Sequence, residues 1–146
     1  MVTQEFPMNA EAALRRKVDA YLASIDAADS ESGKELWETS ERVSFIHPRG
    51  HEYGWDEVAK NFYGITMGAT FSQRALRLDG EPRITVYNDA AVIEFEWTFV
   101  ALRVDNGETL RSVGRESQVF IRAEEDWKLV HVHYSGPPVT GAGQGF

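Results

Sequence analysis

The chain has 146 residues, of which 42% are hydrophobic, 12% are aromatic and none is cysteine, and its formal net charge is −8. This length and apolar content predict a single domain over residues 1–146. The lack of cysteine excludes disulfides, thiolate metal sites and cysteine nucleophiles, and the acidic balance argues against nucleic-acid partners. The sequence shows no membrane-length apolar run and no secretory signal, so we expect no membrane partner and a cytoplasmic location.

Helical periodicity recurs in three segments of the first half of the chain. The first helix, which Asn9 can cap, has one apolar face made of Leu14, Val18, Tyr21, Leu22 and Ile25. A shorter helix fits residues 34–38, with a start signal at Asp29-Ser30. The third helix follows Gly54, and its apolar face consists of Trp55, Val58, Phe62 and Ile65.

Alternating apolar residues predict strands elsewhere. Val43, Phe45 and His47 indicate a short strand that Pro48 ends. From residue 71 onward the pattern is β, and segments 84–87, 90–102, 110–122 and 126–135 form an antiparallel meander. The Gly- and Pro-rich residues 137–146 are predicted to be a loose tail. Helices followed by a paired sheet indicate an α+β fold, in which a curved antiparallel sheet packs against the N-terminal helices.

The turns of the meander predict which residues lie side by side. With two-residue hairpins at Asn106-Gly107 and Glu124-Glu125, one sheet face carries three cross-strand rows: Ile93, Phe120 and Leu129; Phe95, Gln118 and His131; and Trp97, Glu116 and His133. The opposite face is too apolar for free solvent, since it carries Val113, Val119, Ile121, Val130, Val132 and Tyr134. A homodimer that covers this face is therefore expected.

Two stretches resemble known proteins. The run from Trp127 to Gly136, preceded by the strand of Glu116, resembles the end of the association domain of calcium/calmodulin-dependent protein kinase II. His47-Pro48, then Gly50 and Gly54 before a helix, resembles the bacterial SnoaL-like members of the nuclear transport factor two-like superfamily. The resemblance implies a cone-shaped, cystatin-like fold with one pocket. Relatives include isomerases, cyclases, dehydratases and modules that only bind or associate, so function depends on the pocket.

The predicted pocket contains candidates for acid–base chemistry. Glu116 beside His133 would fix the tautomer of the imidazole and raise its basicity, which suits a general base, while Tyr21 or His47 polarises an oxygen of the substrate. The ligand-binding candidates are Trp37, His47, Phe62, Phe95, Trp97, Gln118 and His131. A divalent metal on His47, one of the paired histidines and Glu116 is an alternative, but His-x-His is the only short ligand motif, so we expect neither metal nor cofactor.

Two functions follow from these candidates. In the first, the protein is a cofactor-independent isomerase, cyclase or lyase that acts on a small, largely apolar molecule bearing a carbonyl, hydroxyl or carboxylate. In the second, it is a non-catalytic association or ligand-binding module, and the two histidines only tie the sheet to the helices.

Overall fold

A computed structural model describes the backbone of residues 6–145 and the side chains from residue 10 onward. The helical elements are α1 (Phe6–Ala27), α2 (Ser30–Leu36), α3 (Trp55–Glu57) and the π-helical segment η2 (Val58–Ala69). The strands are β1 (Ser44–His47), β2 (Gly50–Tyr53), β3 (Phe71–Leu78), β4 (Arg83–Tyr87), β5 (Ala90–Arg103), β6 (Thr109–Ala123) and β7 (Asp126–Ser135). No helix among the described residues is long and apolar enough to span a membrane.

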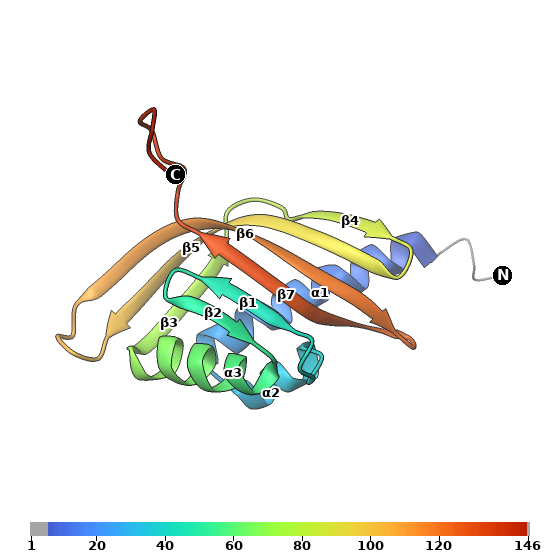
Figure 1. Ribbon diagram of the computed structural model, residues 1–146, viewed down its shortest axis with the longest axis horizontal. Coiled ribbons are helices and arrows are strands. Elements are labelled where there is room, and N and C mark those ends of the chain that lie inside the picture. The colour runs from blue at the N-terminus through green and yellow to red at the C-terminus, as the bar shows by residue number, and fades with distance from the viewer. Residues whose placement is uncertain (1–5, 146) are drawn as a thin grey trace.

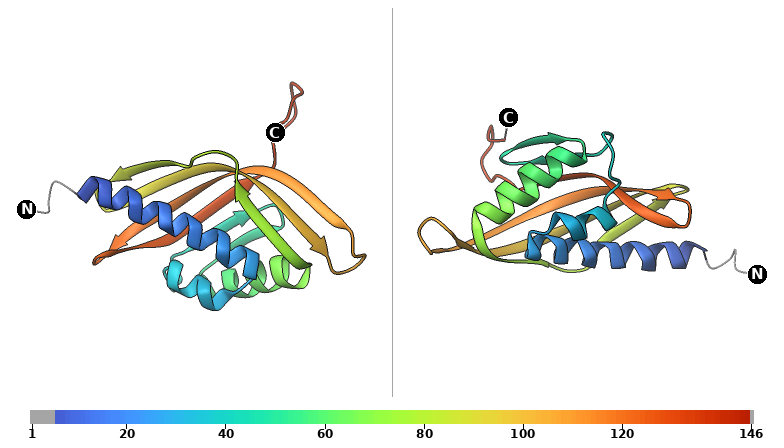
Figure 2. Two further views of the ribbon diagram at one scale, coloured as in Figure 1. Left: turned by 180° about the vertical axis from the view of Figure 1, so that it is seen from behind. Right: turned by 90° about the horizontal axis from the view of Figure 1, so that it is seen from below.

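The sheet is curved and mixed, and the helices lie on one side of it. Its strand order is β2-β1-β7-β6-β5-β3, with β4 paired to β5. Every neighbouring pair is antiparallel except β1 and β7. Figures 1 and 2 show α1, α2 and α3 on the same side of the sheet, and residues 137–145 leaving the sheet without a helix or strand of their own. This arrangement confirms the predicted α+β fold and adds a parallel pair that the sequence did not indicate.

The first two helices follow the sequence pattern, except that α1 starts before its expected cap and α2 ends at Leu36, two residues before the expected end at residue 38. Leu14, Val18, Tyr21 and Ile25 of α1 are buried against the sheet, as the periodicity predicts. The expected cap at Asn9 is wrong, because α1 begins at Phe6 and Asn9 lies inside it. Asp29 caps α2 by accepting the Glu31 backbone N–H at 2.9 Å.

The third helix is wound differently from the prediction. After one α-helical turn it continues as η2, in which backbone hydrogen bonds join residues five apart. This wider winding buries Val58, Phe62 and Met67 but leaves Ile65 46% exposed. The expectation for Ile65 is therefore wrong, since it assumed a period of 3.6 residues.

The long hairpins confirm the predicted faces on β5 and β6, although one register is shifted. Asn88-Asp89 and Glu124-Glu125 are two-residue turns, as expected. The turn between β5 and β6 is instead a four-residue loop over 104–107, so the pairing moves by two residues and Glu116 lies opposite Phe95. An even shift preserves which side chains face inward, because side chains alternate with a period of two.

A β-bulge in β7 changes the face of the sheet to which the last side chains of this strand point. Phe120 pairs with Leu129, but Val119 pairs with His131, which leaves Val130 as an extra residue. Beyond Val130 every side chain of β7 is turned to the opposite face from the one predicted. Val132 and Tyr134 therefore point toward the helices, and His131 and His133 point away.

The bulge also weakens the basis of the expected homodimer. Val132 is fully buried beneath the sheet rather than on its outer face. Val113 remains on the outer face and is 41% exposed, and Val119, Ile121 and Val130 are partly buried. Association through this face stays a prediction.

Candidate functional site

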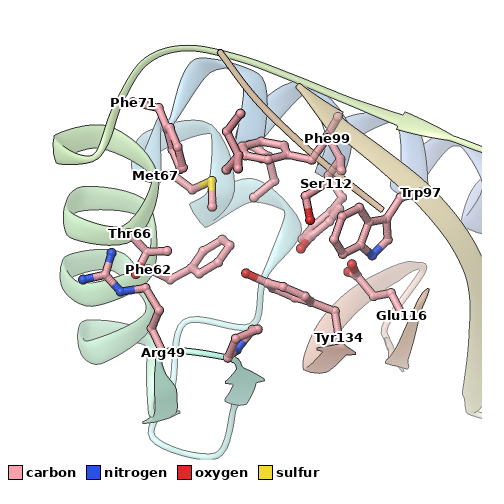
Figure 3. A pocket seen from close by; sticks show the side chains of 15 residues that line it. Arg49, Phe62, Thr66, Met67, Phe71, Trp97, Phe99, Ser112, Glu116 and Tyr134 are labelled. Carbon is pink, nitrogen blue, oxygen red and sulfur yellow. The ribbon is translucent and has the colours of Figure 1, made fainter. Parts of the chain in front are cut away.

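A cavity of about 190 Å³ opens between the helices and the inner face of the sheet (Figure 3). Its wall is largely apolar, with a few polar groups. The lining residues are Tyr21, Ile25, Pro48, Arg49, Phe62, Thr66, Met67, Phe71, Leu76, Trp97, Phe99, Leu110, Ser112, Glu116 and Tyr134. For scale, an engineered apolar cavity of about 150 Å³ holds one benzene molecule. This cavity has room for a molecule of about one ring.

The exposure of the lining residues distinguishes a closed end from a mouth. Tyr21, Trp97 and Glu116 are buried and form the closed end. Pro48 and Arg49 are exposed and border the mouth. The cavity therefore runs from a solvent-facing cation to a buried carboxyl group.

Glu116 lies in an environment that favours its neutral form. Gln118 donates an Nε2–H to Glu116 Oε2 at 2.8 Å, and the Tyr21 hydroxyl is also hydrogen-bonded to this carboxyl group. Burial raises the pKa of Glu116 to about 8, and the two hydrogen bonds oppose this shift only in part. Burial, with the nearby Glu116, also raises the pKa of Tyr21 well above its usual value. At pH 7 the closed end thus holds a carboxylic acid that can give up a proton.

Two polar atoms near this end have no partner among the described residues. They are Nε1 of Trp97 and Oε1 of Gln118. Figure 3 shows the indole nitrogen of Trp97 turned toward Glu116. A buried polar group without a hydrogen bond costs about 1–3 kcal/mol, and native proteins keep few of them. The closed end of the cavity therefore holds polar atoms to which the surrounding described residues offer no hydrogen bond.

A buried network holds the mouth of the cavity in place. The backbone N–H of Arg49 donates to Nδ1 of His47 at 3.2 Å, so the other ring nitrogen carries the proton of the neutral imidazole and donates to Glu52 at 2.9 Å. Asn61, on η2, donates to the second oxygen of Glu52 at 2.8 Å. The imidazole stacks on Tyr134, with ring centroids 6.3 Å apart. These contacts tie the segment of Arg49 to the helix and to the cavity wall.

The structure brings four of the predicted site residues into the cavity wall. They are Tyr21, Phe62, Trp97 and Glu116. Gln118 is fully buried and does not line the cavity, but it is hydrogen-bonded to Glu116, which does. His47 also lies behind the wall, in contact with Phe62 and Tyr134. Trp37 and Phe95 are buried but do not line the cavity.

The predicted dyad of Glu116 and His133 is wrong. Because of the bulge at Val130, Glu116 lies opposite Tyr134, and His133 is exposed on the other face of the sheet. His131 is on that outer face too, where its Nδ1 is 2.8 Å from the Ser44 hydroxyl and burial lowers its pKa. These positions also contradict the alternative metal set, and the described residues contain no group of three side chains suited to a metal.

Sequence reasoning missed Tyr134 and Arg49, which both line the cavity. The signal for Tyr134 was present in the alternation of β7. The prediction that His131 and His133 face inward places Val132 and Tyr134 on the outer face, and the apolar outer face that results is the reason for expecting a homodimer. The bulge places Val132 and Tyr134 inside without a partner chain, whereas Val113, Val119, Ile121 and Val130 stay on the outer face. Arg49 had no comparable signal, because it follows the predicted strand in a short turn.

The comparison with known families identifies the fold. The SnoaL-like domain family matches residues 14–140. The chain belongs to this SnoaL-like family. A nuclear transport factor two-like superfamily protein from Salmonella enterica is 52% identical, covers 96% of this chain and 99% of its own, and has a TM-score of 0.94. No curated protein sequence matches this SnoaL-like chain.

More distant structures share the SnoaL-like fold. A proposed dehydratase from Streptomyces avermitilis is 19% identical with a TM-score of 0.78, and covers 91% of this chain and 99% of its own. A hexachlorocyclohexane dehydrochlorinase is 13% identical with a TM-score of 0.78, and covers 92% of both chains. A proposed calcium/calmodulin-dependent protein kinase II association domain from Xanthomonas campestris is 15% identical with a TM-score of 0.71, and covers 90% of this chain and 88% of its own, in line with the resemblance noted in the sequence.

Proposed function

We propose that this SnoaL-like protein is an acid–base enzyme, a lyase or an isomerase, that acts on a small and largely apolar molecule with a hydroxyl or carbonyl oxygen. One observation carries the proposal: the closed end of the cavity holds Glu116, whose pKa is raised to about 8 by burial. A carboxyl group that keeps its proton at pH 7 can protonate a substrate oxygen, which an ordinary surface carboxylate cannot do.

The neighbours of Glu116 suit the proton transfer. When Glu116 gives its proton to a leaving hydroxyl or a carbonyl oxygen, a buried carboxylate is left behind. This carboxylate takes the proton from the carbon next to the carbonyl group, which restores the acid and completes the loss of water or the isomerisation. The hydrogen bonds from Gln118 and Tyr21 stabilise that carboxylate, since both lower the pKa of Glu116. The rate should therefore fall as Glu116 ionises above about pH 8.

The relatives support this class of reaction by analogy. The Streptomyces protein is a proposed dehydratase, and the other relative is named as a dehydrochlorinase of hexachlorocyclohexane. Both are less than 20% identical to this chain, so they share its fold and carry no residue roles over to it.

A non-catalytic ligand-binding module is the second candidate. One observation favours it: His47, the nearest imidazole to the cavity among the described residues, is separated from it by Phe62 and Tyr134. Glu116 therefore has no imidazole beside it, and its neighbours Tyr21 and Tyr134 keep their protons because burial raises the pKa of both hydroxyls. In that case the same cavity would bind a ligand and release it unchanged.

Proton exchange and elimination in small ketones test the choice between these functions. The probes are a panel of aryl ketones, cyclic ketones and β-hydroxy ketones, starting from phenylacetone and 4-hydroxybutan-2-one, followed by NMR in heavy water. The wild type is expected to accelerate exchange or loss of water for members that raise its melting temperature. Glu116→Gln is expected to slow this reaction by about 100- to 10,000-fold.

Glu96→Gln is the matched control, because Glu96 lies on β5 with its exposed side chain on the opposite face of the sheet. It should leave the rate unchanged. Probes that stabilise the wild type without exchanging a hydrogen or losing water would contradict the enzyme and favour the binding module.

A further inference from the structure

We infer that the preferred ligand is a small monocarboxylate, whose apolar body fills the cavity and whose carboxylate binds Arg49 at the mouth. This inference names the ligand class of the proposed site and so rests on the proposed function. It follows from the charge and position of Arg49 and from the size of the cavity.

Arg49 has a positive charge that no carboxylate of the described residues pairs with in a salt bridge. Its side chain makes one long hydrogen bond, to the Thr70 hydroxyl at 3.4 Å. Guanidinium groups bind carboxylates through paired, charge-assisted hydrogen bonds. The mouth therefore has a free cation suited to that group.

The charge of Arg49 acts on the inside of the cavity. Tyr134 lines the cavity wall, and its pKa is raised by burial while the nearby Arg49 opposes that shift. The hydrogen bond from the Arg49 backbone to the buried His47 fixes this part of the chain. Figure 3 shows Arg49 at the edge of the lining, next to Thr66 and Phe62, with its guanidinium turned outward. Binding of a carboxylate in the cavity therefore requires this exposed side chain to turn toward the mouth.

The other lining residues explain why a single negative charge is tolerated. Arg49 and Glu116 are the only Asp, Glu, Lys or Arg residues among the lining side chains, and Glu116 is neutral below about pH 8. A carboxylate at the mouth thus meets a cation and no competing anion at neutral pH. Above about pH 8 the ionised Glu116 would repel it. The apolar wall between the two groups selects a ring or a short hydrocarbon body.

Benzoate and benzamide form the test, because they have nearly the same shape and differ in charge. Calorimetric titration of the wild type at pH 7 is expected to give a dissociation constant for benzoate about tenfold below that for benzamide, which corresponds to about 1.4 kcal/mol. Arg49→Gln should abolish this preference, and Arg49→Lys should keep part of it. Arg111→Gln is the control, since Arg111 is exposed on β6 and alternates with the lining residues Leu110 and Ser112.

A pH series separates binding inside the cavity from loose pairing with Arg49. The affinity of the wild type for benzoate should fall between pH 7 and pH 9, and Glu116→Gln should remove that fall. Equal binding of benzoate and benzamide by the wild type, or unchanged benzoate binding in Arg49→Gln, would overturn the inference. If the protein turns over ketones but does not prefer benzoate, the proposed ligand class is wrong and the proposed enzyme stands. If it prefers benzoate but turns over none of the probes, the proposed enzyme is wrong and the ligand class stands.

Discussion

Replacing Glu116 by glutamine is expected to stabilise the folded protein at neutral pH. The folded protein holds the proton of Glu116 up to about pH 8, while an unfolded chain releases it near the ordinary value of 4.5. Folding therefore takes up a proton between these pH values, and the stability of the wild type falls as pH rises through that window. Glutamine has nearly the same shape as glutamate and no charge to bury, so the free energy of unfolding of the variant should not fall over this pH range.

The size of the effect follows from the shift of the pKa. Each pH unit inside the window costs about 1.4 kcal/mol, so the variant should be about 3 kcal/mol more stable than the wild type at pH 7. In a chain of this length that difference raises the melting temperature by roughly 6–12 °C. The gap should close near pH 4.5, where both states of the wild type hold the proton.

Thermal melts of the wild type and the variant from pH 4.5 to pH 9 measure this gap. Glu96→Gln, on the outer face of the neighbouring strand β5, should not show a gap to the wild type that widens with pH in this way. A gap between the wild type and Glu116→Gln that is constant with pH would mean that Glu116 is already ionised at neutral pH. Greater stability combined with lost turnover is the pattern expected of a residue kept for function at a cost in stability.

Replacing Trp97 by alanine is expected to destabilise the protein by about 3–5 kcal/mol, because a large buried side chain is removed. Trp97 is 6% exposed and packs edge-on against Tyr134, with ring centroids 5.5 Å apart. Its ring lies directly over Gly114, where an added Cβ would collide with it. The strand across from Trp97 is thus shaped to accept the indole.

The loss should be partly recovered by a ligand that fills the space left behind. Indole added to Trp97→Ala is expected to raise its melting temperature in a concentration-dependent way. Trp37→Ala is the matched control, since Trp37 is also a buried tryptophan but does not line the cavity. It should lose similar stability and show less recovery with indole. If Trp97→Ala melts close to the wild type, Trp97 does not form the cavity wall.

The inward faces of β5 and β6 could be predicted because strand alternation survives errors in the loops. The loop at 104–107 is longer than the Asn106-Gly107 hairpin that was expected, yet the pairing moves by an even number of residues. Trp97 and Glu116 therefore remain on the inner face. The first helix was predictable for a similar reason, because Tyr21 belongs to a regular run of buried positions.

The remainder of the site depends on irregularities that periodicity does not reveal. One extra residue, Val130, turns the end of β7 over, so that Tyr134 replaces His133 beside Glu116. The π-helical winding of η2 places Met67 at the cavity and turns Ile65 outward. Arg49 reaches the mouth through the short turn between β1 and β2, and β2 was not predicted at all.

The carbon NMR titration of the Glu116 carboxyl group tests the central claim most directly. In protein labelled at glutamate side chains, the signal missing from Glu116→Gln identifies this carboxyl carbon. Its midpoint is expected near pH 8, because burial at the closed end of the cavity disfavours the charged form. A midpoint near 4.5 would contradict the account, since Glu116 would then be an ordinary carboxylate at pH 7 with no proton to give.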